Sequence, residues 1–214
     1  NRSLEGAVRG WKLPVGTVLD QALYEQEKKR LINTAINQGY LDTVFIKREL
    51  KVNSRTNKAS IALVVDTKEQ YVFGETTCKQ DVLDQGLLDR YLPYEKGDPY
   101  QPAKIFELQA ILYRTDFFSK VIVRGKMDDI RDHVVPVEID LVVPEKLNKY
   151  NVGGGYATDT GIRGKIDWTN RMLNTRGHKM SAHLQVAELE NSLSLLFEIP
   201  RKDPRYDTLI HSLG

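Results

Sequence analysis

The feature that most constrains this chain is a series of segments after residue 150 in which apolar and polar residues alternate. Ile162, Ile166 and Trp168 fall on one face of the first segment, and Arg163 and Lys165 fall on the other. The same alternation recurs over 180–186 and 192–199. A period of two predicts strands whose two faces meet different surroundings. A transmembrane barrel with lipid outside and water inside has this pattern, and so does a soluble antiparallel sheet with one buried face.

The amino-acid composition limits the kinds of protein that this chain can be. Charged residues make up 28% of the chain and the net charge is +2, which gives no electrostatic reason to expect a nucleic-acid partner. No apolar run approaches the ~20 residues of a membrane helix, so any membrane crossing has to be made by strands. The chain starts at Asn1 and stops at Gly214 inside a strand-like run. We therefore expect a segment of a longer protein.

A repeat precedes the alternating strands. Matching positions lie about 78 residues apart, the size of a small domain. Each copy has a Leu-Pro turn, a helix ending near an aromatic residue, and two strands. The expected helices are 20–38 and 102–114, and the expected strands are 44–52, 59–65, 120–125 and 134–143. A strand at 71–75 and a short helix at 81–91 complete a β-α-α-β-β order in the second copy, and 4–11 is the corresponding short helix of the first.

Four short motifs accompany this order. They are Tyr-Val-Phe-Gly-Glu at 71–75, Gly-Asp-Pro-Tyr at 97–100, Val-Gly-Gly-Gly-Tyr-Ala-Thr-Asp-Thr-Gly at 152–161 and Asn-Thr-Arg-Gly-His at 174–178. With the repeat, they resemble the outer-membrane assembly (Omp85/BamA) family, which joins periplasmic POTRA domains to a C-terminal β-barrel. The nearest branch is that of the translocation and assembly module subunit, TamA.

The resemblance implies an α+β fold of tandem POTRA domains followed by antiparallel strands of a transmembrane β-barrel, incomplete in this chain. The expected divisions are 1–69 for a POTRA domain without its first strand, 70–146 for a complete POTRA domain, and 147–214 for the first barrel strands. The family has three such domains before a barrel of about sixteen strands. One domain and most of the barrel are thus expected to lie outside this chain.

The resemblance also implies a function. The expected protein is a TamA-like assembly or translocation factor of the Gram-negative outer membrane, with its POTRA domains in the periplasm. It would bind client β-strands and promote insertion or secretion of barrel proteins such as autotransporters. No bond is made or broken, so we expect neither an enzyme nor a cofactor. The implied partners are unfolded outer-membrane clients, an inner-membrane-anchored TamB-like protein and the lipid bilayer, with no nucleic acid.

The first hairpin strand of each repeat is the expected site of client binding, because an exposed sheet edge can pair with an incoming strand. The residues are Val44, Ile46 and Leu50 in the first strand and Lys120, Val121, Ile122 and Val123 in the second. The alternative is that Lys47, Lys51, Lys120 and Arg124 protect these edges from pairing, as charged side chains often do.

The glycine run after Tyr150 is the expected lateral seam of the barrel. Its residues are Val152, Gly153, Gly154, Gly155 and Tyr156. Three glycines remove side-chain packing and loosen the strand, and the resemblance implies a weak seam that opens into the bilayer. The alternative is that the glycines only relieve crowding against a neighbouring aromatic ring. A phosphate-binding loop is discounted, because a turn and a strand follow instead of a helix.

Catalytic and metal-binding patterns are sparse. The four histidines, His133, His178, His183 and His211, have no metal-ligand spacing. Asp128, Asp129 and Asp132 crowd one hairpin turn, which predicts a solvated turn. Asp159 and Arg163 are expected to pair across the barrel lumen, a structural role.

Three further functions stay open at this level. One is a two-partner secretion pore that exports a dedicated partner, which the number of POTRA domains in the full chain would discriminate. Another is an enzyme whose catalytic domain precedes Asn1. The last is a soluble peptide-binding module, which is disfavoured because the apolar faces between 162 and 199 would have nothing to bury them.

Overall fold

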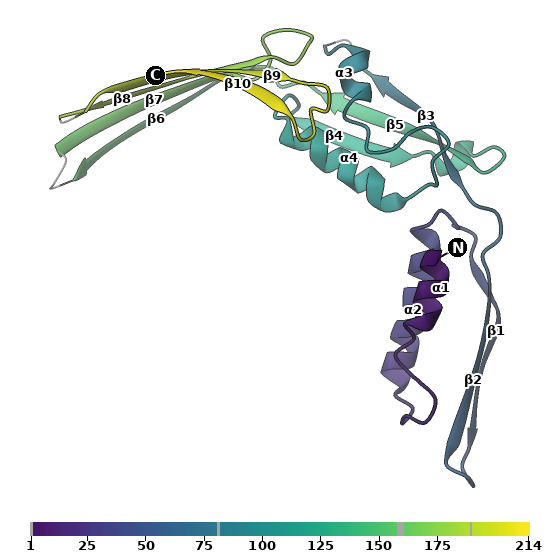
Figure 1. The fold of residues 1–214 in the computed structure, drawn as a ribbon. Helices are drawn as coiled ribbons and strands as arrows, with labels where there is room; N and C mark the ends of the chain where they lie inside the picture. The colour runs from purple at the N-terminus through teal and green to yellow at the C-terminus, as the bar shows by residue number, and fades with distance from the viewer. Residues whose placement is uncertain (1, 81, 158–160, 189) are drawn as a thin grey trace. The chain divides into compact units, whose positions relative to one another are not determined.

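The computed structural model describes residues 2–80, 82–157, 161–188 and 190–214, and Figure 1 shows the course of the chain. The fold is α+β, with POTRA-like helix–sheet elements followed by an antiparallel sheet. In chain order the elements are α1 (Arg2–Arg9), α2 (Gln21–Ile36), β1 (Val44–Asn53), β2 (Lys58–Asp66), β3 (Val72–Lys79), α3 (Gln85–Asp89), α4 (Pro102–Arg114), β4 (Lys120–Gly125), η1 (Met127–Asp129), β5 (Val134–Val142), β6 (Asn148–Ala157), β7 (Gly161–Asn170), β8 (Lys179–Ala187), β9 (Ser192–Pro200) and β10 (Thr208–Leu213).

These strands form three sheets within the described residues. The hairpin β1-β2 is the first, β3-β5-β4 is the second, and β10-β9-β8-β7-β6 is the third. None of the described helices has the length and apolar character needed to span a bilayer.

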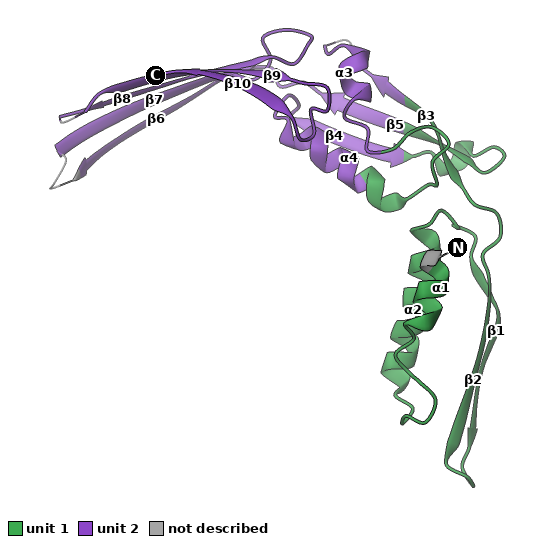
Figure 2. Ribbon diagram, viewed as in Figure 1, with its two compact units in different colours: residues 1–76, 94–105, 125–137 green, residues 77–93, 106–124, 138–214 purple. Residues whose placement is uncertain are grey.

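Contacts divide the chain into two compact units, coloured in Figure 2. The first holds residues 1–76, 94–105 and 125–137, and the second holds 77–93, 106–124 and 138–214. The division passes through the second repeat. The expected domain boundaries, 1–69, 70–146 and 147–214, stay a prediction.

The helices of the first repeat are held by a cap and a buried charge. Asp20 Oδ1 accepts a hydrogen bond from the Leu23 amide at 3.1 Å, which confirms the expected start of α2. The helix ends at Ile36, two residues earlier than expected, and Gly39 follows with a φ of +88°. Glu27 is fully buried and pairs with Arg30 at 2.6 Å, and Arg30 also donates to the Ala7 carbonyl at 2.7 Å. That contact ties α1 to α2.

The sheet β3-β5-β4 carries the buried core of the second repeat. Val135 and Val137 on β5 are fully buried, as are Leu108 on α4 and Phe73 on β3. The Phe73 ring stacks on Tyr94 with a centroid distance of 3.7 Å. The helix α4 and the strand β4 have the bounds that the sequence predicts.

The expected helix at 81–91 is wrong in length, because α3 covers only Gln85–Asp89. The Gln80 side chain explains the late start. Its Oε1 accepts hydrogen bonds from the amides of Val82 and Leu83 at 2.8 and 2.7 Å. A side chain that captures these amides fixes a turn in place of the first helical turn.

The five-stranded sheet is a meander in which each strand pairs with the next in sequence. Directly opposed residues lie on the same face of an antiparallel sheet. One row across four strands runs Val152, Ile166, Leu184, Leu193. The adjacent row runs Asn151, Asp167, His183, Ser194. The pairing therefore keeps apolar residues on one face and polar residues on the other, as the alternation predicts.

Candidate functional site

The strand β4 lies at an edge of its sheet, since the strand order is β3-β5-β4. Val121 and Val123 point into the core, with 7% and 6% of their surface exposed, while Ile122 is half-buried and Lys120 is exposed. The structure thus places the four predicted residues on an edge strand. Pairing of a client strand there stays a prediction.

The edge of β4 already has one internal partner. The Val123 amide donates to Gln109 Oε1 of α4 at 3.2 Å, so a helix side chain satisfies a strand N–H that no neighbouring strand takes. An incoming strand that used this amide would have to displace Gln109. Sequence reasoning missed Gln109, because a single glutamine beside buried Leu108 has no distinctive pattern.

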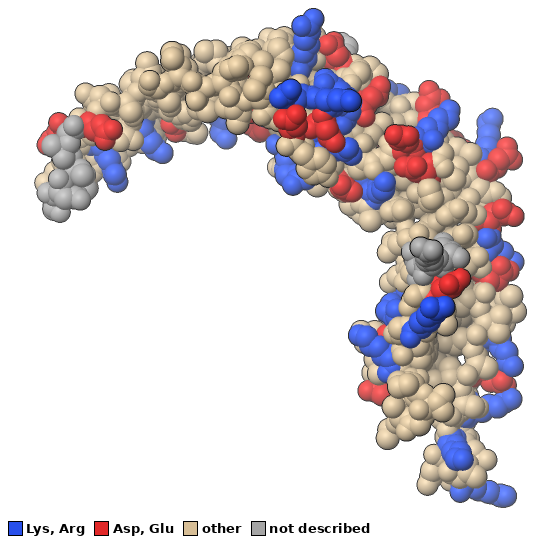
Figure 3. Space-filling model, viewed as in Figure 1, with Lys and Arg blue, Asp and Glu red and all other residues tan. Residues whose placement is uncertain are grey.

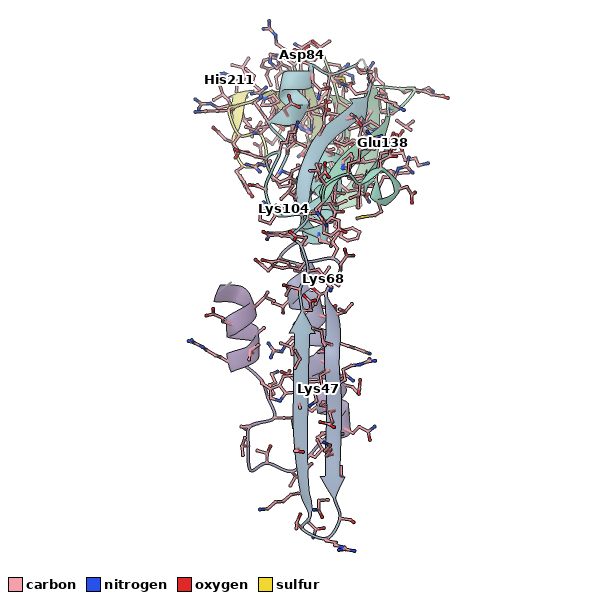
Figure 4. The ribbon with its side chains drawn as sticks, turned by 90° about the vertical axis from the view of Figure 1, so that its right-hand side faces the viewer. Lys47, Lys68, Asp84, Lys104, Glu138 and His211 are labelled. Atoms are coloured by element: carbon pink, nitrogen blue, oxygen red, sulfur yellow. The ribbon has the colours of Figure 1, made fainter. Side chains whose placement is uncertain are left out.

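Three of the four cations expected to protect the two edges form ion pairs with nearby carboxylates. Glu49 pairs with Lys47 at 3.2 Å and with Lys51 at 2.7 Å. Lys47 projects from the β1–β2 hairpin in Figure 4. Arg124 pairs with Glu138 at 3.3 Å and with Asp140. These side chains stay solvated at the edges, and protection of the edges by them stays the alternative prediction.

The strand β1 pairs with β2 alone among the described strands. Its register shifts between Phe45 and Lys47, which makes Ile46 the extra residue of a β-bulge. Val44 and Ile46 are 48% and 68% exposed, and Leu50 is half-buried opposite Ile61. A bulge twists and interrupts a strand edge. Client pairing at Val44, Ile46 and Leu50 stays a prediction, and the bulge lies at the second of these residues.

The glycine strand β6 lies at one edge of the five-stranded sheet. Val152 and Tyr156 are on the apolar face, with 79% and 73% of their surface exposed. Between them Gly154 lies opposite Gly164, so this rung has no side chain on the apolar face of either strand. The middle of this edge strand therefore carries few side chains. Its role as a lateral seam stays a prediction.

Two long cationic side chains lie over the other two glycines. A Cβ on Gly153 would lie 3.0 Å from Lys165 Cε, and one on Gly155 would lie 3.5 Å from Arg163 Nε. The stems of Lys165 and Arg163 therefore lie over the bare backbone of β6 on the polar face. No aromatic atom is among these nearest neighbours in the described residues. Relief of crowding against a ring stays an alternative prediction. A Cβ on Gly154 would meet only the Arg163 carbonyl oxygen, at 3.9 Å.

The polar face is linked across strands. His183 Nδ1 lies 3.0 Å from Asp167 Oδ1, and Lys165 Nζ lies 3.9 Å from Asp167 Oδ2. In Figure 3 the charged atoms of this sheet project from its lower side, while its upper side is almost entirely tan. His211 is an exception to the pattern, because it lies opposite Phe197 in an apolar row.

The turn at 174–178 anchors the sheet to the preceding helices within the second unit. Its Thr175 carbonyl accepts a hydrogen bond from the Asp84 amide at 2.9 Å. Gly177 has a φ of +71°, and a Cβ there would lie 2.8 Å from Leu87 Cδ2 and 3.0 Å from Phe117 Cζ. Only glycine combines this backbone angle with so close an approach. Packing of the turn against Leu87 and Phe117 therefore explains the glycine of the Asn-Thr-Arg-Gly-His motif.

The remaining sequence candidates are the histidines, the aspartates of the 127–133 turn and the Asp159–Arg163 pair. No group of three or more potential metal ligands occurs among the residues that the structure describes. Asp129 pairs with Lys126 at 2.8 Å, as expected of a solvated turn. The expected Asp159–Arg163 pair cannot be placed, because Asp159 lies outside the described residues.

Comparison with known proteins relates this fold to proteins of known families. No protein-family model matches the chain. The outer membrane protein assembly factor BamA of Neorickettsia risticii is 24% identical over 152 residues, which cover 69% of this chain and 19% of that protein. The crystal structure of BamA from Haemophilus ducreyi lacking POTRA domains 1–3 matches 95% of this chain with a TM-score of 0.73 and 15% identity.

The chain is homologous to the BamA/Omp85 family. CdiB from Acinetobacter baumannii shares the fold over 99% of the chain, with a TM-score of 0.59 and 12% identity. These BamA/Omp85 likenesses place the POTRA-like elements and the terminal sheet in one known architecture. The chain spans 39% of the H. ducreyi structure and 40% of the CdiB structure.

Proposed function

We propose that this chain is part of a TamA-like assembly or translocation factor of the bacterial outer membrane. The observation that carries the proposal is the apolar face of the five-stranded sheet. Ile162, Leu193 and Leu213 on that face are 65%, 55% and 72% exposed, and they belong to a continuous surface rather than to isolated positions. Monomeric soluble proteins rarely expose a contiguous apolar surface of this kind, whereas lipid covers one on a transmembrane barrel.

The proposed activity is transfer of client β-strands, with no covalent chemistry. Residues 1–146 would lie in the periplasm and offer the edges of β1 and β4 to an unfolded outer-membrane client, such as an autotransporter. The strand β6 would form the seam through which the client enters the bilayer. An inner-membrane-anchored TamB-like partner is part of the same proposal. The strand edges and the homology to an assembly factor support this proposed path of the client from the periplasm to the bilayer.

A photo-crosslinking experiment on the full-length protein tests the proposal. A photoreactive residue replaces Val152 on the edge strand β6, and the matched control replaces Leu184 on the central strand β8, since both lie in one apolar row. With an autotransporter stalled during assembly, we expect a crosslink from position 152 and little from position 184. Equal crosslinking at both positions would contradict a seam at β6. A third probe at Lys120 tests the β4 edge in the same cells.

A further inference from the structure

A cavity of about 310 Å³ lies in the second unit, where the end of α4 meets the start of β8 and the end of β9. Arg114 and Phe117 contribute from the α4 side, Lys179 and Glu198 from the sheet, and Arg205 from the turn before β10. Nothing in the proposed transfer of strands uses this cavity.

Two of the cations that line it have no carboxylate partner among the described residues. Lys179 Nζ lies 4.8 Å from the centre of the Phe117 ring, and Arg114 donates only through Nε to the Ala110 carbonyl, at 3.3 Å. Other cations nearby do have such partners. Arg171 pairs with Asp116 at 3.3 Å, and Arg205 pairs with Asp203 at 2.8 Å. The carboxylates of Glu198 and Asp116 act on Lys179 through space without forming an ion pair with it. A half-buried ammonium and a guanidinium fork that form no ion pair are well suited to an anion.

Tyr91 adds a neutral donor to the same wall. It is 4% exposed and it lines the cavity. Burial raises the pKa of Tyr91 to about 12, so the hydroxyl keeps its proton at neutral pH. The protonated hydroxyl can donate a hydrogen bond to an acceptor bound in the cavity.

Glu198 restricts what kind of anion fits. It is the one acidic residue that lines the cavity in the described structure, and it lies directly opposite Lys179 in the strand register. Its carboxylate accepts hydrogen bonds and repels a bare anion. A ligand that carries both a phosphate and hydroxyl groups satisfies both kinds of lining group, with the phosphate on the cations and a hydroxyl on Glu198.

We propose that this cavity binds the phosphate group of a small hydroxylated molecule. Lys179 and Glu198 alternate with Met180 and Phe197 of the apolar rows, so they belong to the polar face of the sheet. A soluble phosphate ester reaches that face more readily than a lipid headgroup does. Both sources share the chemistry that the cavity recognises, so the test separates them.

The experiment uses the full-length protein in detergent, with isothermal titration of inorganic phosphate and of glycerol 3-phosphate. Vesicles of phosphatidylglycerol, compared with vesicles of phosphatidylcholine, form the lipid arm. The variants are Lys179→Gln and Arg114→Gln on the cavity wall. Arg201→Gln is the matched control, because Arg201 pairs with Asp207 at 3.6 Å and does not line the cavity. Glu198→Gln removes the repulsive charge.

We expect glycerol 3-phosphate to bind, Lys179→Gln and Arg114→Gln to weaken it about tenfold, and Arg201→Gln to leave it unchanged. Glu198→Gln should tighten inorganic phosphate about threefold, a change of opposite sign that loss of folding cannot produce. Binding only to anionic vesicles, with the same order of variants, would assign the phosphate to a lipid headgroup. Absence of binding in both arms, or binding that none of these variants alters, would overturn the proposal.

Discussion

The sheets β3-β5-β4 and β10-β9-β8-β7-β6 have the same alternation of apolar and polar residues, but their apolar faces have different surroundings. On β5, Val135, Val137 and Ile139 are 0%, 0% and 2% exposed. On β6 and β7, Val152 and Ile162 are 79% and 65% exposed. The helix α4 packs against the first sheet, as Figure 1 shows, and no described element covers the apolar face of the second. The same pattern therefore serves a protein core in one region and, in the proposed function, a lipid-facing surface in the other.

The largest expected effect comes from placing a charge on each apolar face. Val137→Asp buries an unpaired carboxylate, so we expect the POTRA-like region to lose about 4 kcal/mol or more of its free energy of unfolding in urea. Leu184→Arg should leave that transition unchanged and instead cost about 2–4 kcal/mol of barrel stability in lipid. His183→Arg, on the polar face beside it, is the control and should change neither quantity. A loss of urea stability by Leu184→Arg that equals that of Val137→Asp would mean both faces are protein cores.

Two carboxylates sharpen the same contrast. Glu27 is fully buried against Arg30, while Asp167 lies on the polar face beside His183. We expect Glu27→Gln to cost about 2–3 kcal/mol, because hydrogen bonds to a charged group are lost inside the fold, and Asp167→Asn to leave the free energy of unfolding nearly unchanged. Urea unfolding of both variants at neutral pH measures the difference.

The cost of Glu27→Gln should depend on pH with a defined sign. The hydrogen bond from Arg30 holds the pKa of Glu27 below its usual value of 4.5. The carboxylate therefore contributes stability above pH 4.5, and that contribution is lost as the pH falls through the lower, folded-state pKa. The gap between the wild type and Glu27→Gln should shrink over that range. A gap that stays constant down to pH 2 would argue against an ionised Glu27.

A smaller effect is expected to separate Gly177, which is packed in the turn at 174–178, from Gly164, which lies on the apolar face of the five-stranded sheet. Gly177→Ala forces a Cβ onto Leu87 in a left-handed backbone, and we expect a loss of about 1–2 kcal/mol in the stability of the second unit. Gly164→Ala meets nothing within 4 Å and should be neutral. Thermal unfolding of both variants makes the comparison. Equal melting temperatures would mean that the turn at 174–178 is not held by this contact.

The smallest stability effect is expected at the glycine strand. Gly154→Val faces open space, so the fold should be unchanged while client insertion slows, because a stiffer edge strand opens less readily. Gly153→Val meets the Lys165 stem and should lower stability as well. Insertion of a radiolabelled autotransporter into proteoliposomes reads out the rate. Normal insertion by a folded Gly154→Val protein would assign the opening to other residues.

The sequence predicts strand positions well where hydrophobic period and turn residues agree. The bounds of α4 and β4 and the alternation of β7 to β9 follow from local pattern alone. The Gln109 contact with Val123, the bulge at Ile46 and the lysine stems over Gly153 depend on which strands and helices become neighbours. Alternation also leaves the surroundings of a face undetermined, since burial depends on whether another element covers it. The structure itself shows the apolar face uncovered.

The most direct test of the account is heat-modifiability of the full-length protein after extraction from outer membranes. The account predicts that the unboiled sample migrates faster on a semi-native gel than the boiled sample, because β6 to β10 are part of a closed and stable barrel. Recovery of the protein in the soluble fraction, with no difference between boiled and unboiled samples, would contradict the lipid-facing interpretation of the five-stranded sheet.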